Sequence, residues 1–520
     1  MPPELGPLEK GALTPLHHRV LLTLCLSLAF LWIYSGQVFL AHNADNDADS
    51  SFFVYGGKVL LSGGVLYQDF WDQKPPMIFW QNAFLLNFFG RDFHAWAWAH
   101  GLTVVTLSLL WLREMRLRIG TPLASVGLLA LAFMFNSNKV LDFGNRTEFG
   151  VACFELLALI LILRAWRKEA PHSLIFAGGA AAIAFLYKPV GMASLLATIA
   201  WSSFKMGQHQ SNSTLKPSLT GFIGCLFLLS IPLFISGQWK AMFDASIFIP
   251  LQFSGTGSPD LGQATWSTFL RLGPFWGIGA GLFALPLALW LSQGNQRRLL
   301  IWVLLWFLAT LCGVILQRHG RPHYDHPLAA PMVTLVLFSL HPILKKIRPR
   351  IFKASFLFGW LFLILFFGHY FIRKQVETSL QLPHQSSKQH EAYQLVGDFI
   401  QSKLEKDETF YYWSLGFSPY LLAERFSPGR LSPSILTFGG HGVDLVRQDL
   451  EHIKSQPNVK LILENPDSFP KDMLNPNSEK HSPEAVTLVR EYLAWKAEYF
   501  HQLKRPDLLP FRVFLKKESD

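Results

Sequence analysis

Charged residues are scarce in this sequence. Asp, Glu, Lys and Arg make up 16% of the 520 residues and half are hydrophobic, whereas soluble domains carry about 25% charged residues. The shortage is concentrated in residues 1–372, where long uncharged runs recur, and the remainder has the composition of a soluble protein. We therefore expect one integral membrane domain followed by one appended domain.

Cysteine is also scarce, and no cysteine lies in the polar C-terminal part. All four (Cys25, Cys153, Cys225 and Cys312) fall inside apolar runs, without the spacing of a metal site. A disulfide framework and a cysteine zinc site are therefore not expected. A cleavable signal peptide is not expected either, because the first apolar run, from Val20 to Phe39, has no small-residue cleavage site.

The net charge of +10 does not indicate a nucleic-acid partner, because the basic residues lie at the ends of apolar runs. Basic groups follow alternate runs, as at 113–118, 164–168 and 345–353. Short basic loops face the cytoplasm in membrane proteins. This pattern predicts a multi-pass protein with a cytoplasmic N-terminus and an extracytoplasmic C-terminal domain.

About eleven runs approach the roughly 20 apolar residues that a transmembrane helix needs. They are 19–41, 95–112, 121–137, 148–164, 173–187, 189–204, 218–236, 273–293, 298–316, 326–342 and 354–372. Only Lys188-Pro189 separates the fifth run from the sixth. This pair predicts either a re-entrant hairpin or two short helices.

From about residue 386 the pattern changes to short strands that alternate with helices. Strands are predicted at 408–415, 459–465 and 511–517, and helices at 390–404, 419–426, 443–455 and 484–500. Alternation of this kind predicts a small α/β domain with a partly parallel sheet. We place the membrane domain at 1–380, including a first extracytoplasmic loop at 42–94, and the α/β domain at 381–520. The glycines at 439–442 lack the strand–loop–helix context of a nucleotide site, so a turn is expected there.

Three aspartates, Asp45, Asp47 and Asp49, follow the first apolar run directly. Carboxylates are costly near lipid, so this cluster indicates a function. Asp49 is the first choice for a reacting carboxylate, although it could also cap the helix expected after it. Solvated or capping roles are favoured for Asp45 and Asp47. The Asp-x-Asp spacing also suits a hard divalent cation, which stays open as an alternative to a site that requires no cofactor.

A polar and aromatic patch runs from Tyr67 to Pro76 in the same predicted loop. Lys74 is placed to pair with a loop aspartate and so to order the loop. Tyr67 suits either an interfacial anchor or a platform on which a sugar ring stacks.

The order of these residues resembles the first extracytoplasmic loop of bacterial GT-C glycosyltransferases. The similar enzymes are the protein O-mannosyltransferase-like and aminoarabinose-transferase-like members of glycosyltransferase family 39. The matching segments are Asp49, Tyr67–Pro76, Phe89–Gly90, Asn145–Glu148, Phe185–Pro189 and Gly320–Tyr324. That family usually has Asp-Glu at the acidic position, whereas here Asp49 is followed by Ser50.

The resemblance implies a GT-C membrane fold in the bacterial inner membrane, with the C-terminal domain in the periplasm. It implies transfer of a hexosyl or pentosyl group from a polyprenyl-phosphate-linked sugar to an unidentified acceptor, which is a lipid, a glycan or a protein. Asp49 would be the general base. The substrate-binding residues would be Asp47, Tyr67, Asp69, Lys74, Glu148, Lys188, Arg318, Arg321, His323 and Tyr324.

Several of these residues have simpler interpretations. Lys188 could extend its ammonium to the membrane surface, although a phosphate or carboxylate partner would also relieve the cost of burying it. Glu148 could cap its helix, and the segment from Arg318 to His323 could be a solvated loop. For Glu155, within an apolar run, the role of a protonated or hydrogen-bonded structural glutamate is favoured.

Two other classes of protein would share many of these features. A transporter or flippase of lipid-linked saccharide is the main alternative, but such a protein should have broken helices in matching halves. Only one Lys-Pro break is evident here. A polymerase or ligase of the O-antigen type is also multispan but lacks the early acidic loop.

Overall fold

The computed structural model describes most of the chain. The described residues are 15–43, 48–137, 145–203, 209–250, 261–271, 280–317, 321–347, 359–361, 373, 376–377, 391–414, 416–431, 439–465, 483–508 and 510–517. They belong to two compact units. The first combines Met1–Ala41, Phe93–Pro232 and Pro259–Leu380, and the second combines His42–Asp92, Leu233–Ser258 and Gln381–Asp520.

The first unit is helical. Its α-helices are α1 (Pro15–Asn43), α4 (Phe93–Ile119), α5 (Thr121–Asn136), α7 (Thr147–Lys168), α8 (Pro171–Tyr187), α9 (Ala193–Ser203), α10 (His209–Ile235), α13 (Leu261–Arg271), α15 (Leu285–Leu291), α16 (Gly294–Leu316) and α17 (Ala329–Lys346). Three 3-10 segments join them: η2 (Pro189–Met192), η5 (Ala280–Ala284) and η6 (Pro322–Leu328). Within the described residues, six helices are long and apolar enough to cross a membrane. The expected multispan helical fold is confirmed, and the count of eleven spans stays a prediction.

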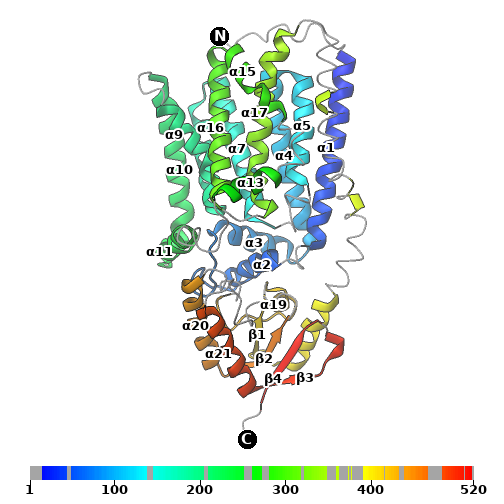
Figure 1. Ribbon diagram of the computed structural model, residues 1–520, viewed down its shortest axis with the longest axis vertical. Coiled ribbons are helices and arrows are strands. Elements are labelled where there is room, and N and C mark those ends of the chain that lie inside the picture. The colour runs from blue at the N-terminus through cyan, green and yellow to red at the C-terminus, as the bar shows by residue number, and fades with distance from the viewer. Residues whose placement is uncertain are drawn as a thin grey trace. The chain divides into compact units, whose positions relative to one another are not determined.

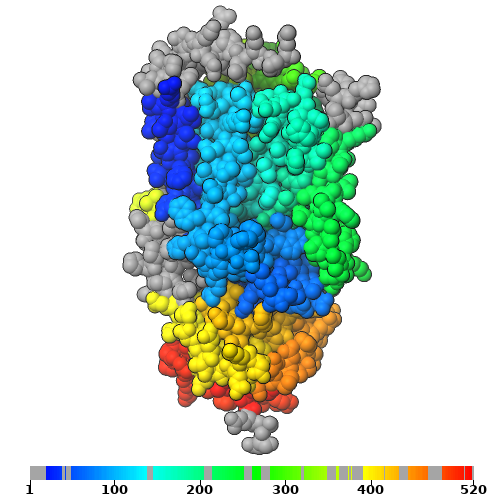
Figure 2. Space-filling view, turned by 180° about the vertical axis from the view of Figure 1, so that it is seen from behind, coloured from blue at the N-terminus to red at the C-terminus, as the bar shows by residue number. Residues whose placement is uncertain are grey.

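Burial distinguishes inner from outer helices in this unit. Large aromatic side chains such as Trp111, Trp302 and Trp306 are fully buried. In the view of Figure 1, α7, α16 and α17 lie between α1 and α10. Figure 2 shows α1 in dark blue and α10 in green on opposite sides of this unit. These outer helices expose leucine and phenylalanine side chains, which is the pattern of surfaces that face lipid.

The chain breaks between α8 and α9 at Lys188. Pro189 has no N–H with which to continue a helix and restricts the residue before it to extended backbone. Lys188 is accordingly extended, with φ −164° and ψ 141°. Of the two arrangements expected here, the structure has two separate short helices joined by η2.

The second unit joins the loop after α1 to the C-terminal part of the chain. Its elements are α2 (Ala48–Leu61), α3 (Met77–Phe89), α11 (Trp239–Phe243), the π-helical η3 (Asp244–Phe248), a helix at 391–403, β1 (Thr409–Trp413), α19 (Ser418–Leu422), α20 (Gly439–Ser455), β2 (Val459–Glu464), α21 (Pro483–Tyr499), β3 (Phe500–Leu503), η9 (Pro506–Leu508) and β4 (Arg512–Lys516). Residues 42–94 were expected in the membrane domain, whereas the structure groups 42–92 with this unit.

The sheet has the order β1-β2-β4-β3. β1 and β2 are parallel, and the other two pairs are antiparallel. The expected partly parallel sheet is thus confirmed, and so are the three predicted strands. β3 was not predicted, because Phe500 was assigned to the end of the preceding helix.

One local prediction is wrong. The glycines at 439–442 form the start of α20 and not a turn. The helix is specified by the apolar residues that follow at helical spacing, Val443, Val446, Leu450 and Ile453, all of which are buried.

Candidate active site

Asp49 lies in the first turn of α2. The helix start expected at this position is therefore confirmed, and the Asp49 side chain is exposed. Ser51 in the same turn donates a hydrogen bond from Oγ to the Ala48 carbonyl, 3.0 Å away. Asp45 and Asp47 lie outside the described residues.

A turn of the C-terminal chain packs directly on this first turn of α2. The Phe417 N–H donates to Ser51 Oγ at 3.0 Å. Gly416 has φ +81°, and a Cβ at that position would lie 2.9 Å from the Ala48 Cα. Since both features require glycine, the 416–417 turn is fitted closely to the backbone that presents Asp49.

The rest of α2 is also fixed by the C-terminal chain. Tyr55 Oη accepts a hydrogen bond from the Ser427 N–H at 2.7 Å. Lys58 Nζ donates to the carbonyls of Tyr420 and Arg425 at 3.3 and 3.1 Å. Burial lowers the pKa of Lys58 to about 8. Hydrogen bonds to backbone groups of the α/β domain therefore hold α2 in place.

The segment from Val65 to Lys74 is a compact loop built around Tyr67. Tyr67 has φ +67°, is 3% exposed, and donates from its hydroxyl to the Lys74 carbonyl at 2.8 Å. It is therefore a buried side chain and not an interfacial anchor. Asp69 accepts a hydrogen bond from the Val65 N–H at 2.8 Å, so its carboxylate also stabilises the loop. Roles of Tyr67, Asp69 and Lys74 in binding stay predictions.

Asp72 is a titratable residue of this region that was not among the expected site residues. Burial raises the pKa of its carboxyl to about 6, Lys74 and the Gln73 N–H oppose the rise, and the charge of Asp49 adds to it. The Gln73 N–H lies 2.7 Å from Asp72 Oδ1. In the sequence, the only indication of a role for Asp72 was its position two residues before Lys74. The effect of the Asp49 charge on its pKa depends on the fold.

A second cluster, in the first unit, brings together three residues from distant parts of the chain. Glu148 begins α7 and is 2% exposed. Lys188 donates from Nζ to Glu148 Oε1, and the same Nζ lies 3.7 Å from the centre of the Tyr324 ring. Thr147 Oγ1 donates to Glu148 Oε2 at 2.9 Å. The ammonium of Lys188 thus has a carboxylate partner and the face of an aromatic ring.

The basic residues near Tyr324 in the sequence differ in their burial. The His323 ring lies 4.6 Å from that of Tyr324 and is buried. Arg321 is exposed, and Arg318 lies outside the described residues. Arg146 was quoted in the family motif but was not selected as a site residue, yet it is buried just before α7.

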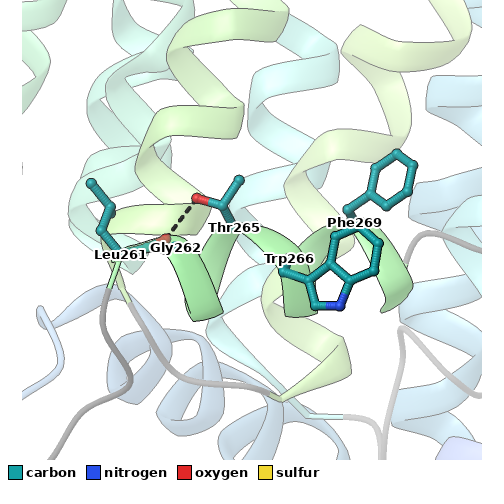
Figure 3. Close-up of a pocket in the computed structure, with 5 residues that line it drawn as sticks. All are labelled: Leu261, Gly262, Thr265, Trp266 and Phe269. Atoms are coloured by element: carbon teal, nitrogen blue, oxygen red, sulfur yellow. Dashed lines mark hydrogen bonds between the residues drawn. The ribbon is translucent and has the colours of Figure 1, made fainter.

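A shallow hollow of about 560 Å³ lies on α13. Leu261, Gly262, Thr265, Trp266 and Phe269 line it, and Figure 3 shows their arrangement along this one helix. None of the expected site residues lines it. In the part of the chain that the structure describes, no three His, Cys, Asp or Glu residues are grouped as metal ligands.

Comparisons with known proteins concern the fold of the chain and one segment of its sequence. The family model described as dolichyl-phosphate-mannose-protein mannosyltransferase matches residues 73–235. ArnT from Cupriavidus metallidurans bound to undecaprenyl phosphate matches with a TM-score of 0.61 at 13% identity, over 96% of this chain and 98% of ArnT. Its apo form matches with a TM-score of 0.57 at 14% identity, over 95% and 97%. The chain has the GT-C fold.

The GT-C resemblance inferred from the sequence is thereby confirmed. The archaeal oligosaccharyltransferase AglB from Archaeoglobus fulgidus, in complex with an inhibitory peptide and a dolichol-phosphate, matches with a TM-score of 0.52 at 11% identity, over 97% of this chain and 74% of AglB. No curated protein sequence matches the chain. The six long apolar helices among the described residues indicate a membrane protein.

Proposed function

We propose that this protein is a membrane glycosyltransferase that uses a polyprenyl-phosphate-linked sugar as donor. The observation that carries the proposal is the Glu148–Lys188–Tyr324 cluster. A largely buried ammonium between apolar helices is expensive, and such a residue is by default a candidate for a functional site. Both Glu148 and Lys188 lie within the segment 73–235 that matches the mannosyltransferase model. Two proteins with a similar fold support the proposal: ArnT was observed with undecaprenyl phosphate, and AglB with a dolichol-phosphate.

The proposed reaction is transfer of one glycosyl group. An acceptor oxygen or nitrogen forms a bond to the anomeric carbon, and its proton passes to the carboxylate of Asp49, the general base. The bond between the anomeric carbon and the phosphate oxygen breaks, and polyprenyl phosphate leaves as an anion. Lys188 supplies positive charge to that phosphate, a form of stabilisation that is strong in a site with little water.

The second unit has a supporting role in this proposal. The Asp49 turn contacts the 416–417 turn, and α2 is held by backbone groups of the C-terminal domain. We assign to that domain the positioning of Asp49. Tyr67, Asp69 and Lys74 would then shape and bind substrate in the loop after α2. The protein would act on the periplasmic side of a bacterial inner membrane.

The test is transfer in vitro from a panel of polyprenyl-phosphate sugars to membrane extract. Wild type is compared with Lys188→Met and with Asp398→Asn, a matched control that removes an exposed carboxylate from the helix at 391–403. We expect label transfer with wild type and the control, and at least tenfold weaker use of donor by Lys188→Met. If folded wild type transfers no sugar but moves lipid-linked saccharide across vesicle membranes, the protein is a flippase.

A further inference from the structure

Two buried glutamates occupy one face of α7. Glu148 and Glu155 are seven residues apart and are 2% and 1% exposed. Seven residues make about two helical turns, so the two side chains point the same way and lie roughly 10 Å apart along the axis.

One glutamate binds the start of the linker between α8 and α9, and the other binds the first turn of α9. Glu148 binds the ammonium of Lys188 at the start of the linker. Glu155 accepts hydrogen bonds from the N–H and the Oγ of Ser194, at 3.1 and 3.0 Å. Ser194 is the second residue of α9, where an N–H lacks a partner within the helix and a carboxylate is favourable.

A third helix fixes Glu155 from the other side. Trp306 of α16 donates from Nε1 to Glu155 Oε2 at 2.5 Å. Trp302, one turn earlier, donates to Thr198 Oγ1 at 3.2 Å, and Thr198 donates to the Ser194 carbonyl at 2.9 Å. Hydrogen bonds thus join α7, α9 and α16 around Ser194.

Glycines bring the linker into close contact with its surroundings. A Cβ on Gly150 of α7 would lie 2.5 Å from the ring of Tyr187, the residue before Lys188. A Cβ on Gly313 of α16 would overlap the side chain of Val190. A shift of α9 therefore moves the linker as a whole, because close-packed groups transmit displacement.

We propose that Glu155 is a positioning residue that holds the Lys188 ammonium in place through Ser194 and the packed linker. This inference rests on the proposed function, in which Lys188 binds the phosphate of the lipid donor. Glu155 itself has hydrogen-bond partners on α9 and α16 and acts on the substrate only through Lys188.

The test measures binding of undecaprenyl phosphate and the kinetics of transfer in detergent. Glu155→Gln keeps the shape but brings an NH2 group against the N–H donors of Ser194 and Trp306. We expect a five- to twentyfold rise in the Kd for undecaprenyl phosphate and in the donor KM, with kcat within about twofold. Glu155→Asp keeps a carboxyl group and should recover part of the affinity. The control is Glu114→Gln, which disrupts another buried glutamate, the partner of Arg167, away from the linker.

A double substitution distinguishes positioning from general loosening of the helix bundle. If Glu155 acts through Lys188, the Lys188→Met/Glu155→Gln protein should bind undecaprenyl phosphate no more weakly than Lys188→Met alone. Additive losses, or equal losses in Glu114→Gln, would overturn the inference. If Lys188→Met itself binds as tightly as wild type, the proposed function of Lys188 fails instead. If Glu155→Gln does not fold, Trp306→Phe takes its place. This variant removes one hydrogen-bond donor to Glu155 and must give a smaller loss of affinity for undecaprenyl phosphate.

Discussion

Breaking the Glu148–Lys188 ion pair should reduce stability by more than surface ion pairs do. The Lys188 and Glu148 side chains are 12% and 3% exposed, so removal of either partner leaves a buried charge. The cost of such an unpaired charge is about 3–5 kcal/mol, against about 0–1 kcal/mol for exposed pairs. The Tyr324 ring, 3.7 Å from Nζ, offsets at most about 2 kcal/mol for the ammonium. We therefore expect Glu148→Gln to lose about 2–4 kcal/mol and Lys188→Met about 3–5 kcal/mol.

The assay is unfolding in detergent, by heat or denaturant, for both single variants and the Glu148→Gln/Lys188→Met double variant. The double variant contains no unpaired charge at this position, so it should be more stable than either single one. The coupling free energy should be at least about 2 kcal/mol. Losses below about 1 kcal/mol that simply add would show that the pair is solvated and would refute the burial argument.

Three further predictions concern the second unit. Gly416→Ala places a Cβ 2.9 Å from the Ala48 Cα, on a residue with φ +81°. The variant should lose about 1–3 kcal/mol of stability in thermal unfolding, and its kcat should fall more than its donor KM rises. An unchanged kcat would argue against the positioning of Asp49 by this turn. Folding raises the pKa of Asp72 from 3.8 to about 6. The free energy of unfolding should therefore fall by at most about 3 kcal/mol as the pH rises from about 4 to about 6. Asp72→Asn should abolish this fall, and parallel pH curves for wild type and variant would contradict the prediction. Asp449→Ala removes the carboxylate that accepts hydrogen bonds from the N–H groups of Arg430 and Leu431, at 3.0 and 3.3 Å. It should lower the free energy of chemical unfolding by about 2–3 kcal/mol. The exposed control Asp398→Asn should change it by no more than about 0.5 kcal/mol.

Local patterns in the sequence were sufficient to predict most helices and strands. Long apolar runs predicted α1, α4, α7 and α16, and short β-branched and aromatic runs predicted β1, β2 and β4. β3 was missed because Phe500 continues a helical pattern, and only its pairing with β4 makes it a strand. The glycines at 439–442 were misjudged because glycine signals a turn only where no strong helical pattern follows.

The association of distant segments could not be predicted from local patterns. A carboxylate partner of Lys188 was one of the expectations from the sequence, but Glu148 could not be identified as that partner because 40 residues separate the two. The packing of α2 on the C-terminal domain could not be predicted either, because that contact joins residues more than 360 positions apart. Burial of Tyr67 and the raised pKa of Asp72 follow from the same tertiary packing.

Glycosyl transfer by wild type and Asp49→Asn, measured side by side with one accepted polyprenyl-phosphate sugar, tests whether Asp49 is the general base. The amide keeps the size of the side chain but cannot take a proton from the acceptor. We expect transfer by wild type, a loss of at least a hundredfold in kcat for Asp49→Asn, and binding of undecaprenyl phosphate to Asp49→Asn within about twofold of wild type. Transfer by Asp49→Asn at the wild-type rate would contradict the assignment of the general base.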